Sequence, residues 1–434
     1  MRKIQLVLLA TLISFLLLLF GIELLSNFIY FSKRGHLFYL DTRDQPLSKT
    51  DANSTAQAVF HPYISYIHRV GRTGTYPVGG NDVTWTTNNV GFQVLQGIVN
   101  ADPKCCDYPS AKRDGEVVVG IFGGSVASGF ALTVQGTSQF ADSLARIPEW
   151  SGKKFRFLNF AMPGFKQPQQ LIALAYYLSL GQHFDVVLNI DGFNEVVTSH
   201  RNWSAGVEPS FPADTLWGDW GRTLEKRAFA FDEGFGDSYL AAYLGIEAKE
   251  WNQQAENCIT AACFVIYRSL GEFYRYRASR LGGNKRNLLE RSTLFPNSIS
   301  SVPNKDVDIF SSTANQWASS SRLMATTLRN SGALYMHVIQ PNQWLKTSGD
   351  YQPIDKDHIY KWVIDLVNDG YPRLLLQVPA LVASGVPVYD ATMIFRGLPA
   401  RELYSDDCCH FTEKGAQLFA TGIAKQVTLL KSKE

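Results

Sequence analysis

The chain has 434 residues, a formal net charge of +2 and 45% hydrophobic residues, nine of its residues being tryptophan. This length is sufficient for a large buried core and suggests more than one domain. A near-neutral chain whose Lys and Arg residues are scattered lacks the concentrated basic surface that binds phosphate backbones. Nucleic acid is therefore excluded as the main partner.

The N-terminal segment is expected to be a membrane anchor. From Ile4 to Phe31 the only charged residue is Glu23. An apolar stretch of about 20 residues spans the hydrocarbon core as a helix, because its backbone polar groups are then satisfied internally. A cleaved signal peptide is the alternative, but its apolar region is shorter, about 7–15 residues, and ends in a small-residue cleavage site. Residues 1–31 are thus expected to form a single-pass transmembrane helix.

The orientation of this helix depends on a nearly balanced distribution of positive charge. Arg2 and Lys3 precede the apolar stretch, and Lys33 and Arg34 follow it. The free amino group tips the balance toward a cytoplasmic N-terminus. The body of the protein would then lie outside the cytoplasm, in a periplasmic or extracellular position.

The cysteines are an even set, which is compatible with disulfides in an exported protein. A bond from Cys258 to Cys263 would close a short loop, whereas buried free thiols are the alternative. Cys105 or Cys106 could also be bonded to Cys408 or Cys409. A metal site at Cys408, Cys409 and His410 is disfavoured, because consecutive ligands rarely match tetrahedral zinc spacing. No metal or cofactor is expected. The six cysteines are Cys105, Cys106, Cys258, Cys263, Cys408 and Cys409.

Residues 32–115 mix polar, Gly-rich and short aromatic stretches. Within them, Val83–Thr87 predicts a strand and Asn88–Gly91 a turn. We expect residues 32–115 to be a membrane-proximal arm that packs on the main domain and is not an independent fold.

Residues 116–434 predict an α/β domain. Apolar strands that alternate with helices indicate a parallel sheet covered on both faces, with ligands outside the carboxyl ends of the strands. Residues from about 200 to 310 interrupt this pattern and are interpreted as an insertion that caps or lines the site. The expected strands are Val117–Phe122, Phe155–Phe160, Val186–Ile190, Ala333–Ile339 and Val386–Tyr389, and the expected helices are Ser138–Ile147, Gln169–Leu180, Asn315–Arg329 and Ile359–Val367.

Candidate active-site groups follow the first three strands and precede the last helix. Ser125 stands on a glycine turn after the first strand and is the candidate nucleophile. His410 would be the base, and Asp407, three residues earlier, would orient it. The backbone N–H groups of Ser125 and Gly164 and the side-chain amide of Asn194 would form the oxyanion hole.

This order of motifs resembles the SGNH, or GDSL-like, hydrolase superfamily. Its four named positions correspond to Ser125, Gly164, Asn194 and His410, with Asp407 completing the triad. The resemblance covers about residues 116–199 and 330–430. It implies a flavodoxin-like, three-layer α/β/α fold and ester hydrolysis or acyl transfer, often on acylated glycans or lipid-like esters.

One position departs from the family pattern. Gly124 precedes the serine where the family motif has Asp, so the local support of the serine turn differs. Three functions are left open: an extracytoplasmic esterase, an O-acyltransferase that modifies an envelope polysaccharide, and an inactive binding module of an envelope complex. An α/β-hydrolase is the rival fold, but its Gly-x-Ser-x-Gly motif would need glycine where Ala127 stands.

Overall fold

A five-stranded parallel sheet forms the centre of the larger of two units. Its strand order is β10-β9-β8-β6-β7. Every neighbouring pair is parallel. Counted along the chain, this is the order 2-1-3-4-5 of a flavodoxin-like sheet, so the expected fold class is confirmed. The strands are β6 (Glu116–Gly123), β7 (Lys154–Asn159), β8 (Val186–Asp191), β9 (Leu334–Ile339) and β10 (Val388–Asp390).

The three central strands, β6, β8 and β9, were predictable because they are buried on both faces. Every residue of β8 and of β9 is buried, as is all of β6 after its first residue. A parallel sheet covered on both sides has continuous apolar strands, and these are visible in a sequence.

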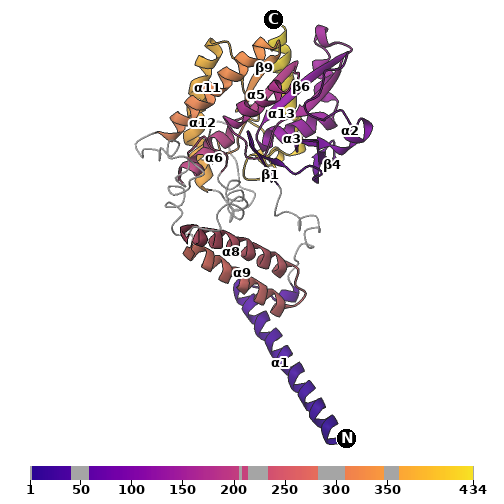
Figure 1. Ribbon diagram of the computed structural model, residues 1–434, viewed down its shortest axis with the longest axis vertical. Coiled ribbons are helices and arrows are strands. Elements are labelled where there is room, and N and C mark those ends of the chain that lie inside the picture. The colour runs from indigo at the N-terminus through magenta and orange to yellow at the C-terminus, as the bar shows by residue number, and fades with distance from the viewer. Residues whose placement is uncertain are drawn as a thin grey trace. The chain divides into compact units, whose positions relative to one another are not determined.

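Two layers of helices cover the sheet (Figure 1). One layer contains the helix that begins at Ser125, and α13 packs against it; in the other, α11 packs against α5, α6 and α12. The helix after Ser125 was not expected from the sequence. The first layer comprises α3 (Ser125–Gly136), α4 (Gln139–Leu144) and α13 (Glu413–Lys431), and the second α5 (Gln169–Ser179), α6 (Phe193–Ser204), α11 (Ile309–Asn330) and α12 (Lys361–Ala383).

The segment before β6 packs on the same sheet. The Tyr108 hydroxyl donates to the Asn159 carbonyl at 3.2 Å, and the Asn159 amide donates to the Gln93 carbonyl at 3.1 Å. The ring of Tyr108 stacks on that of Phe160. The segment contains the hairpin β1 (Ala58–His61) and β2 (Ser65–His68), the antiparallel sheet β3 (Thr73–Val78), β4 (Asn81–Thr87) and β5 (Gln93–Leu95), and α2 (Gln96–Ala101).

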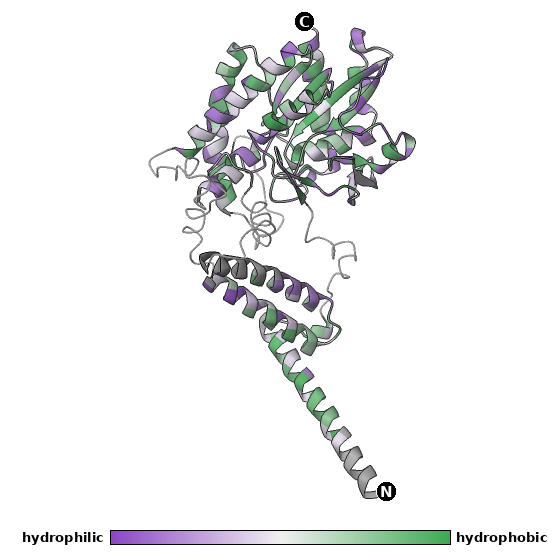
Figure 2. Cartoon of the chain, viewed as in Figure 1, coloured by the Kyte–Doolittle hydropathy of each residue, from purple (hydrophilic) through white to green (hydrophobic). Residues whose placement is uncertain are grey.

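The smaller unit contains the N-terminal helix. Within α1 (Arg2–Arg34), Ile13–Ser32 is long and apolar enough to cross a membrane, with a mean hydropathy of 1.9. The part of α1 coloured in Figure 2 is mainly hydrophobic. The unit also holds η1 (Phe38–Leu40), α8 (Glu233–Glu256) and α9 (Ala261–Leu281).

Glu23, the charged residue of the apolar stretch, binds the N-terminus of α9. Its carboxylate accepts the N–H groups of Ala261 at 2.7 Å and Ala262 at 3.0 Å. These are among the N–H groups that a helix start leaves without an intrahelical partner. A disulfide joins Cys258, before α9, to Cys263 in the first turn of α9, which is the local loop that the sequence suggested.

This division of the chain differs from the expected boundaries at residues 31 and 115. α9, from the predicted interruption, belongs with α1, because α9 is capped by Glu23 and packs along α1. The two units are Met1–Thr55 with Asp219–Pro296, and Ala56–Gly218 with Asn297–Glu434. The computed structural model describes residues 2–40, 58–204, 208–213, 233–281, 308–346 and 361–433.

Candidate active site

Ser125 lies where β6 passes into α3, and two glycines allow this turn. Gly123 has φ +142°, and a Cβ there would lie 2.0 Å from the Ile190 carbonyl oxygen of β8. A Cβ on Gly124 would lie 2.3 Å from the Asn194 amide nitrogen. Both glycines therefore let the serine turn approach the end of the neighbouring strand. Ser125 is the first residue of α3, so its backbone N–H lies at the positive end of a helix.

His410 precedes the last helix and reaches the serine. Its Nε2 lies 2.8 Å from the Ser125 Oγ, a distance at which the hydroxyl donates to the ring. The following residues fix the start of α13, because Thr412 is its N-cap and accepts from the Gly415 N–H. The expected pairing of Ser125 with His410 is therefore present.

The acid that contacts His410 in the structure is Asp406, where Asp407 was expected. The Asp406 Oδ2 accepts from the His410 Nδ1. Its Oδ1 accepts three successive backbone N–H groups, those of Cys408, Cys409 and His410, at 3.0–3.1 Å. The chain therefore wraps around the Asp406 carboxylate and brings the histidine back to it after four residues. Sequence spacing could not separate two adjacent aspartates.

The environment of Asp406 favours its ionised form. Burial raises the pKa of Asp406, but hydrogen bonds from the His410 ring and from backbone N–H groups outweigh it, so the net pKa lies below the ordinary value. A carboxylate at this position holds the His410 tautomer whose Nε2 can accept the serine proton.

Three residues after β9 hold the loop that carries this acid. The side chains of Gln343, Trp344 and Asn342 donate to the carbonyls of residues 406, 407 and 408, at 3.1, 2.7 and 3.1 Å. We call Asn342, Gln343 and Trp344 the β9 clamp. Sequence analysis missed it, although polar residues directly after a buried strand were a visible signal.

The segments that carry Gly164 and Asn194 lie beside the serine turn, since a Cβ on Gly124 would contact Phe165 and Asn194. The Asn194 side-chain amide donates to the Phe165 carbonyl at 3.0 Å and lies against Gly124. An amide NH₂ has two donors, so one is left for a substrate oxygen. Gly164 has φ +81°, a left-handed conformation that favours glycine, and is the residue before Phe165.

Glu195 joins the two loops that supply Gly164 and Asn194. It accepts from the Gly192 N–H at 2.8 Å and from the Gln167 N–H at 3.0 Å. Burial, followed by the Asp191 carboxylate, raises the pKa of Glu195 to about 8, against these N–H donors. Lys166 in the same loop is fully buried and donates to the Pro209 carbonyl. Burial lowers the pKa of Lys166 to about 7.

A pocket of about 300 Å³ opens beside Ser125 and His410. Its wall is mostly aromatic and aliphatic, and part of it comes from residues before β6. Sequence analysis did not foresee this contribution, because pocket residues on strands of the arm carry no local motif. The arm supplies Tyr76, Pro77, Trp85 and Gln93; the remaining wall includes Val126, Phe130, Leu132, Pro163, Phe411 and Phe419.

Two other polar clusters lie in the larger unit. His337 is completely buried and lies 2.8 Å from Asp191 and 2.7 Å from Ser321, so its ring nitrogens have partners within the core. The Cys408, Cys409 and His410 ligand atoms lie within 4.8 Å of one another. Both ring nitrogens of His410 already have partners, so a metal ion there would displace Ser125 or Asp406.

Comparisons with known proteins find structural similarity only. No family model matches the sequence, and no curated protein matches it. A lipase/acylhydrolase from Enterococcus faecalis is 12% identical, with 72% of this chain and 95% of that chain covered at a TM-score of 0.32. An acetylxylan esterase from Geobacillus stearothermophilus, solved as a catalytic mutant, is 9% identical. The match covers 73% of this chain and 95% of that chain, also with a TM-score of 0.32.

A third similar structure is a GDSL-like lipase from Bacteroides thetaiotaomicron. It is 10% identical, with 77% of this chain and 98% of that chain covered, and its TM-score is 0.32. These names describe the activities of those proteins, whereas the role of this chain rests on its own residues.

Proposed function

We propose that the protein is a serine esterase of the SGNH type, which cleaves ester bonds through an acyl-enzyme on Ser125. One observation carries the proposal: Ser125 Oγ lies 2.8 Å from His410 Nε2, and Asp406 holds the other ring nitrogen. Nucleophile, base and orienting acid are thus in contact in the order that acyl transfer needs.

In the proposed reaction, the Ser125 hydroxyl attacks the ester carbonyl while His410 takes its proton. The negative charge on the carbonyl oxygen would be stabilised by the N–H groups of Ser125 and Gly164 and the amide of Asn194. His410 then returns the proton to the leaving alcohol. Water, activated by the same ring, releases the acid and regenerates the serine.

The pocket wall supports an apolar acyl group or a substrate with an apolar face. Aromatic rings of Tyr76, Trp85 and Phe419 line the space beside the serine. Apolar groups gain from leaving water for such a surface. An acylated glycan or a lipid-like ester has both an ester and an apolar portion that fit this chemistry.

We further propose that α1 anchors the protein as a single-pass membrane helix and that the larger unit is extracytoplasmic. Two disulfides, Cys105 with Cys106 and Cys258 with Cys263, support an oxidising compartment. Addition of a membrane-impermeant protease to intact cells and to permeabilised cells tests this location. Cleavage of the larger unit only after permeabilisation of the inner membrane would contradict it.

The esterase proposal is tested on the full chain in detergent with a fluorophosphonate probe and a series of p-nitrophenyl esters. The probe should label Ser125, identified by peptide mass, and both labelling and turnover should be lost in Ser125→Ala and His410→Ala. A folded wild-type protein that neither reacts with the probe nor turns over any ester would instead support a binding module.

Product analysis separates a hydrolase from an O-acyltransferase, because both share the acyl-enzyme. Incubation with an acyl donor and a glycan acceptor should release free acid at a rate that the glycan does not change. If acylated glycan is the main product, the protein is an O-acyltransferase and not a hydrolase, with the same residues in the same roles.

A further inference from the structure

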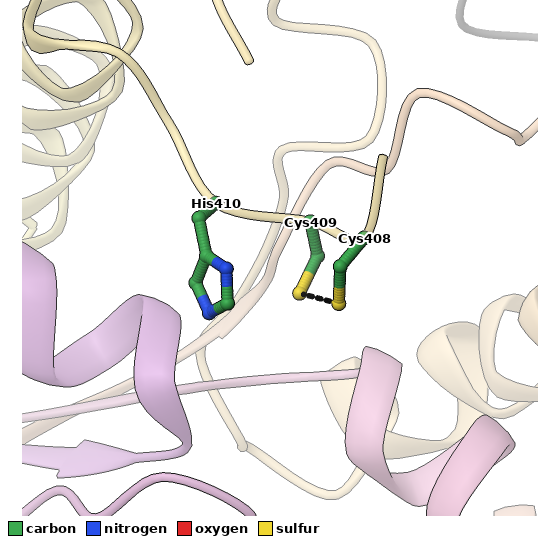
Figure 3. Close-up of side chains that lie close together, drawn as sticks. All are labelled: Cys408, Cys409 and His410. Atoms are coloured by element: carbon green, nitrogen blue, oxygen red, sulfur yellow. Dashed lines mark hydrogen bonds between the residues drawn. The ribbon is translucent and has the colours of Figure 1, made fainter. Parts of the chain in front are cut away.

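Two adjacent cysteines stand between the acid and the base of the proposed triad. The sulfur atoms of Cys408 and Cys409 lie 2.9 Å apart, side by side on the face of the loop that also carries the His410 ring (Figure 3). Cys408 is partly exposed and Cys409 is buried. Cys408 is therefore the more accessible of the two residues, and the buried Cys409 is its immediate neighbour.

The backbone of these cysteines holds the catalytic acid. The N–H groups of Cys408 and Cys409 each donate to the Asp406 Oδ1 at 3.0 Å. The carbonyl of Cys408 is bound by Asn342 of the β9 clamp. A chemical change at the two sulfurs therefore acts on the peptide groups that position Asp406.

The same chain contains an adjacent cysteine pair that is already bonded. Cys105 and Cys106 form a disulfide, which shows that adjacent cysteines of this protein can close the small ring that such a bond requires. The possible tether from Cys105 or Cys106 to Cys408 or Cys409 is not formed, because Cys105 and Cys106 are bonded to each other. Cys408 and Cys409 are free thiols.

We propose that Cys408 and Cys409 form a reversible dithiol–disulfide site, and that closing the disulfide lowers the activity of the Ser125–His410 site. This inference rests on the proposed esterase function. Its co-reactant is a disulfide, either a small molecule or an oxidised dithiol protein.

The exchange takes place in two balanced steps. The Cys408 thiolate attacks the disulfide R–S–S–R, forms Cys408–S–S–R and releases one thiol, RSH. The Cys409 sulfur then attacks the Cys408 sulfur, expels the second RSH and closes the Cys408–Cys409 bond. The protons of the two cysteines end on the two released thiols, and the two electrons reduce R–S–S–R. The sulfur atoms must approach from 2.9 Å to about 2.05 Å.

Ring closure disturbs the acid because the new ring includes the peptide between Cys408 and Cys409. That peptide carries one of the N–H donors to Asp406, so turning it removes a hydrogen bond from the carboxylate. Misplacement of a catalytic group by about 1 Å costs roughly 10²-fold in rate. We expect a fall in kcat of roughly this size, with little change in KM.

The experiment uses the full chain in detergent, equilibrated in glutathione buffers from fully reduced to fully oxidised. Turnover of a p-nitrophenyl ester and the rate of fluorophosphonate labelling of Ser125 are measured in each buffer. Peptide mass spectrometry reports the Cys408–Cys409 bond as the loss of two hydrogens. Two matched variants serve as controls: Cys408→Ser with Cys409→Ser, and Cys105→Ser with Cys106→Ser.

The wild type should lose activity as the bond forms and regain it on reduction. The ratio of oxidised to reduced activity should be close to one in the Cys408/Cys409 variant and unchanged from wild type in the Cys105/Cys106 variant. A disulfide that forms without changing kcat, or one that never forms in the glutathione series, would overturn the proposal. A wild type inactive in every buffer would overturn the esterase function itself, whereas an active enzyme indifferent to the disulfide overturns only the redox site.

Discussion

At the scale of single residues, the departure from the family motif at position 124 has a steric cause. The Asn194 amide nitrogen lies 2.3 Å from the place where a Cβ on Gly124 would stand. A side chain at position 124 would therefore displace a proposed oxyanion donor. Glycine at position 124 leaves the space that the Asn194 side chain occupies in this protein.

Restoring the family aspartate should therefore harm the enzyme. Gly124→Asp is expected to lower kcat roughly 10²–10³-fold, the cost of removing one oxyanion donor. Gly97→Asp is the matched control, because a Cβ at Gly97 has no atom within 4 Å. Kinetics on a p-nitrophenyl ester measure both. Full activity in Gly124→Asp would show that Asn194 does not act in the oxyanion hole.

The two adjacent aspartates show how far sequence reasoning can go. The positions of Ser125 and His410 after a strand and before a helix predicted their contact. The choice of acid depended on the path of a tight loop, in which Asp406 accepts the N–H groups of residues 408, 409 and 410. No spacing rule distinguishes that path from one that brings Asp407 to the ring.

The pair gives a direct test with a built-in control. Asp406→Asn should lower kcat by up to about 10⁴-fold, because an amide favours the wrong histidine tautomer. Asp407→Asn should retain most of the rate, since its place in the loop is fixed by its carbonyl, which Trp344 binds. The reverse ranking of the two kcat values would return the acid role to Asp407.

At the scale of elements, the segments after the strands are held by side chains of neighbouring segments. The β9 clamp fixes the acid loop, and Glu195 joins the two oxyanion loops. The strands and most helices were predictable, because long apolar runs follow from burial on both faces of a parallel sheet. The clamp was not predicted: the polar residues after a buried strand were visible in the sequence, but their bonding partners, about 60 residues away, were not.

Trp344→Phe tests the clamp by removing one N–H and keeping an aromatic ring. A lost hydrogen bond is worth about 1 kcal/mol, so kcat should fall by up to about tenfold. Trp317→Phe also removes a buried indole N–H bond, to Asp191, and should lower the unfolding temperature while leaving kcat close to wild type. Equal loss of kcat in the two variants would mean that the clamp acts only through stability.

The buried Lys166 predicts a pH-dependent stability. Its pKa is lowered from 10.5 to about 7, so the unfolded chain binds more protons between these values and stability rises with pH. The pKa of Glu195 is raised from 4.5 to about 8, so this residue makes stability fall as pH rises, but only up to about pH 8. Above that pH Glu195 no longer opposes the lysine, and comparison with a variant that cannot titrate at position 166 isolates the lysine effect.

From about pH 8 to pH 10, the unfolding free energy of the wild type should therefore rise relative to that of Lys166→Met, which cannot titrate at this position. Denaturant titrations at the two pH values give the difference. A difference independent of pH in this range would contradict a lysine that is neutral in the folded protein.

At the scale of the whole molecule, two units are each built from separate stretches of sequence. Residues far from α1 in sequence belong to its unit because Glu23 caps α9. The sequence suggested an insertion near residues 200–310 but did not indicate that α9, within it, packs on α1. A lone acidic residue in an apolar stretch does not reveal which helix it will cap.

Glu23→Ala should loosen the start of α9. Loss of an N-terminal cap costs about 0.5–2 kcal/mol, so the amides of Ala261 and Ala262 should exchange with solvent several-fold faster or more. Glu272→Ala is the control, because this exposed residue of α9 pairs with Arg275 and does not touch the helix start. Hydrogen exchange read by mass spectrometry compares them. Unchanged exchange at Ala261 would mean that the cap does not stabilise α9.

The arm before β6 forms part of the pocket wall, so the residues that react and some of the residues that shape the pocket come from different parts of the chain. The proposed nucleophile and base come from Ser125 onward, whereas Tyr76, Trp85 and Gln93 come from β3, β4 and β5. A fragment that keeps the substrate pocket must therefore include β3, β4 and β5 and cannot start at the first strand of the parallel sheet. Substrate preference can also diverge among descendants of this gene through changes in these three strands, with the reacting groups left untouched.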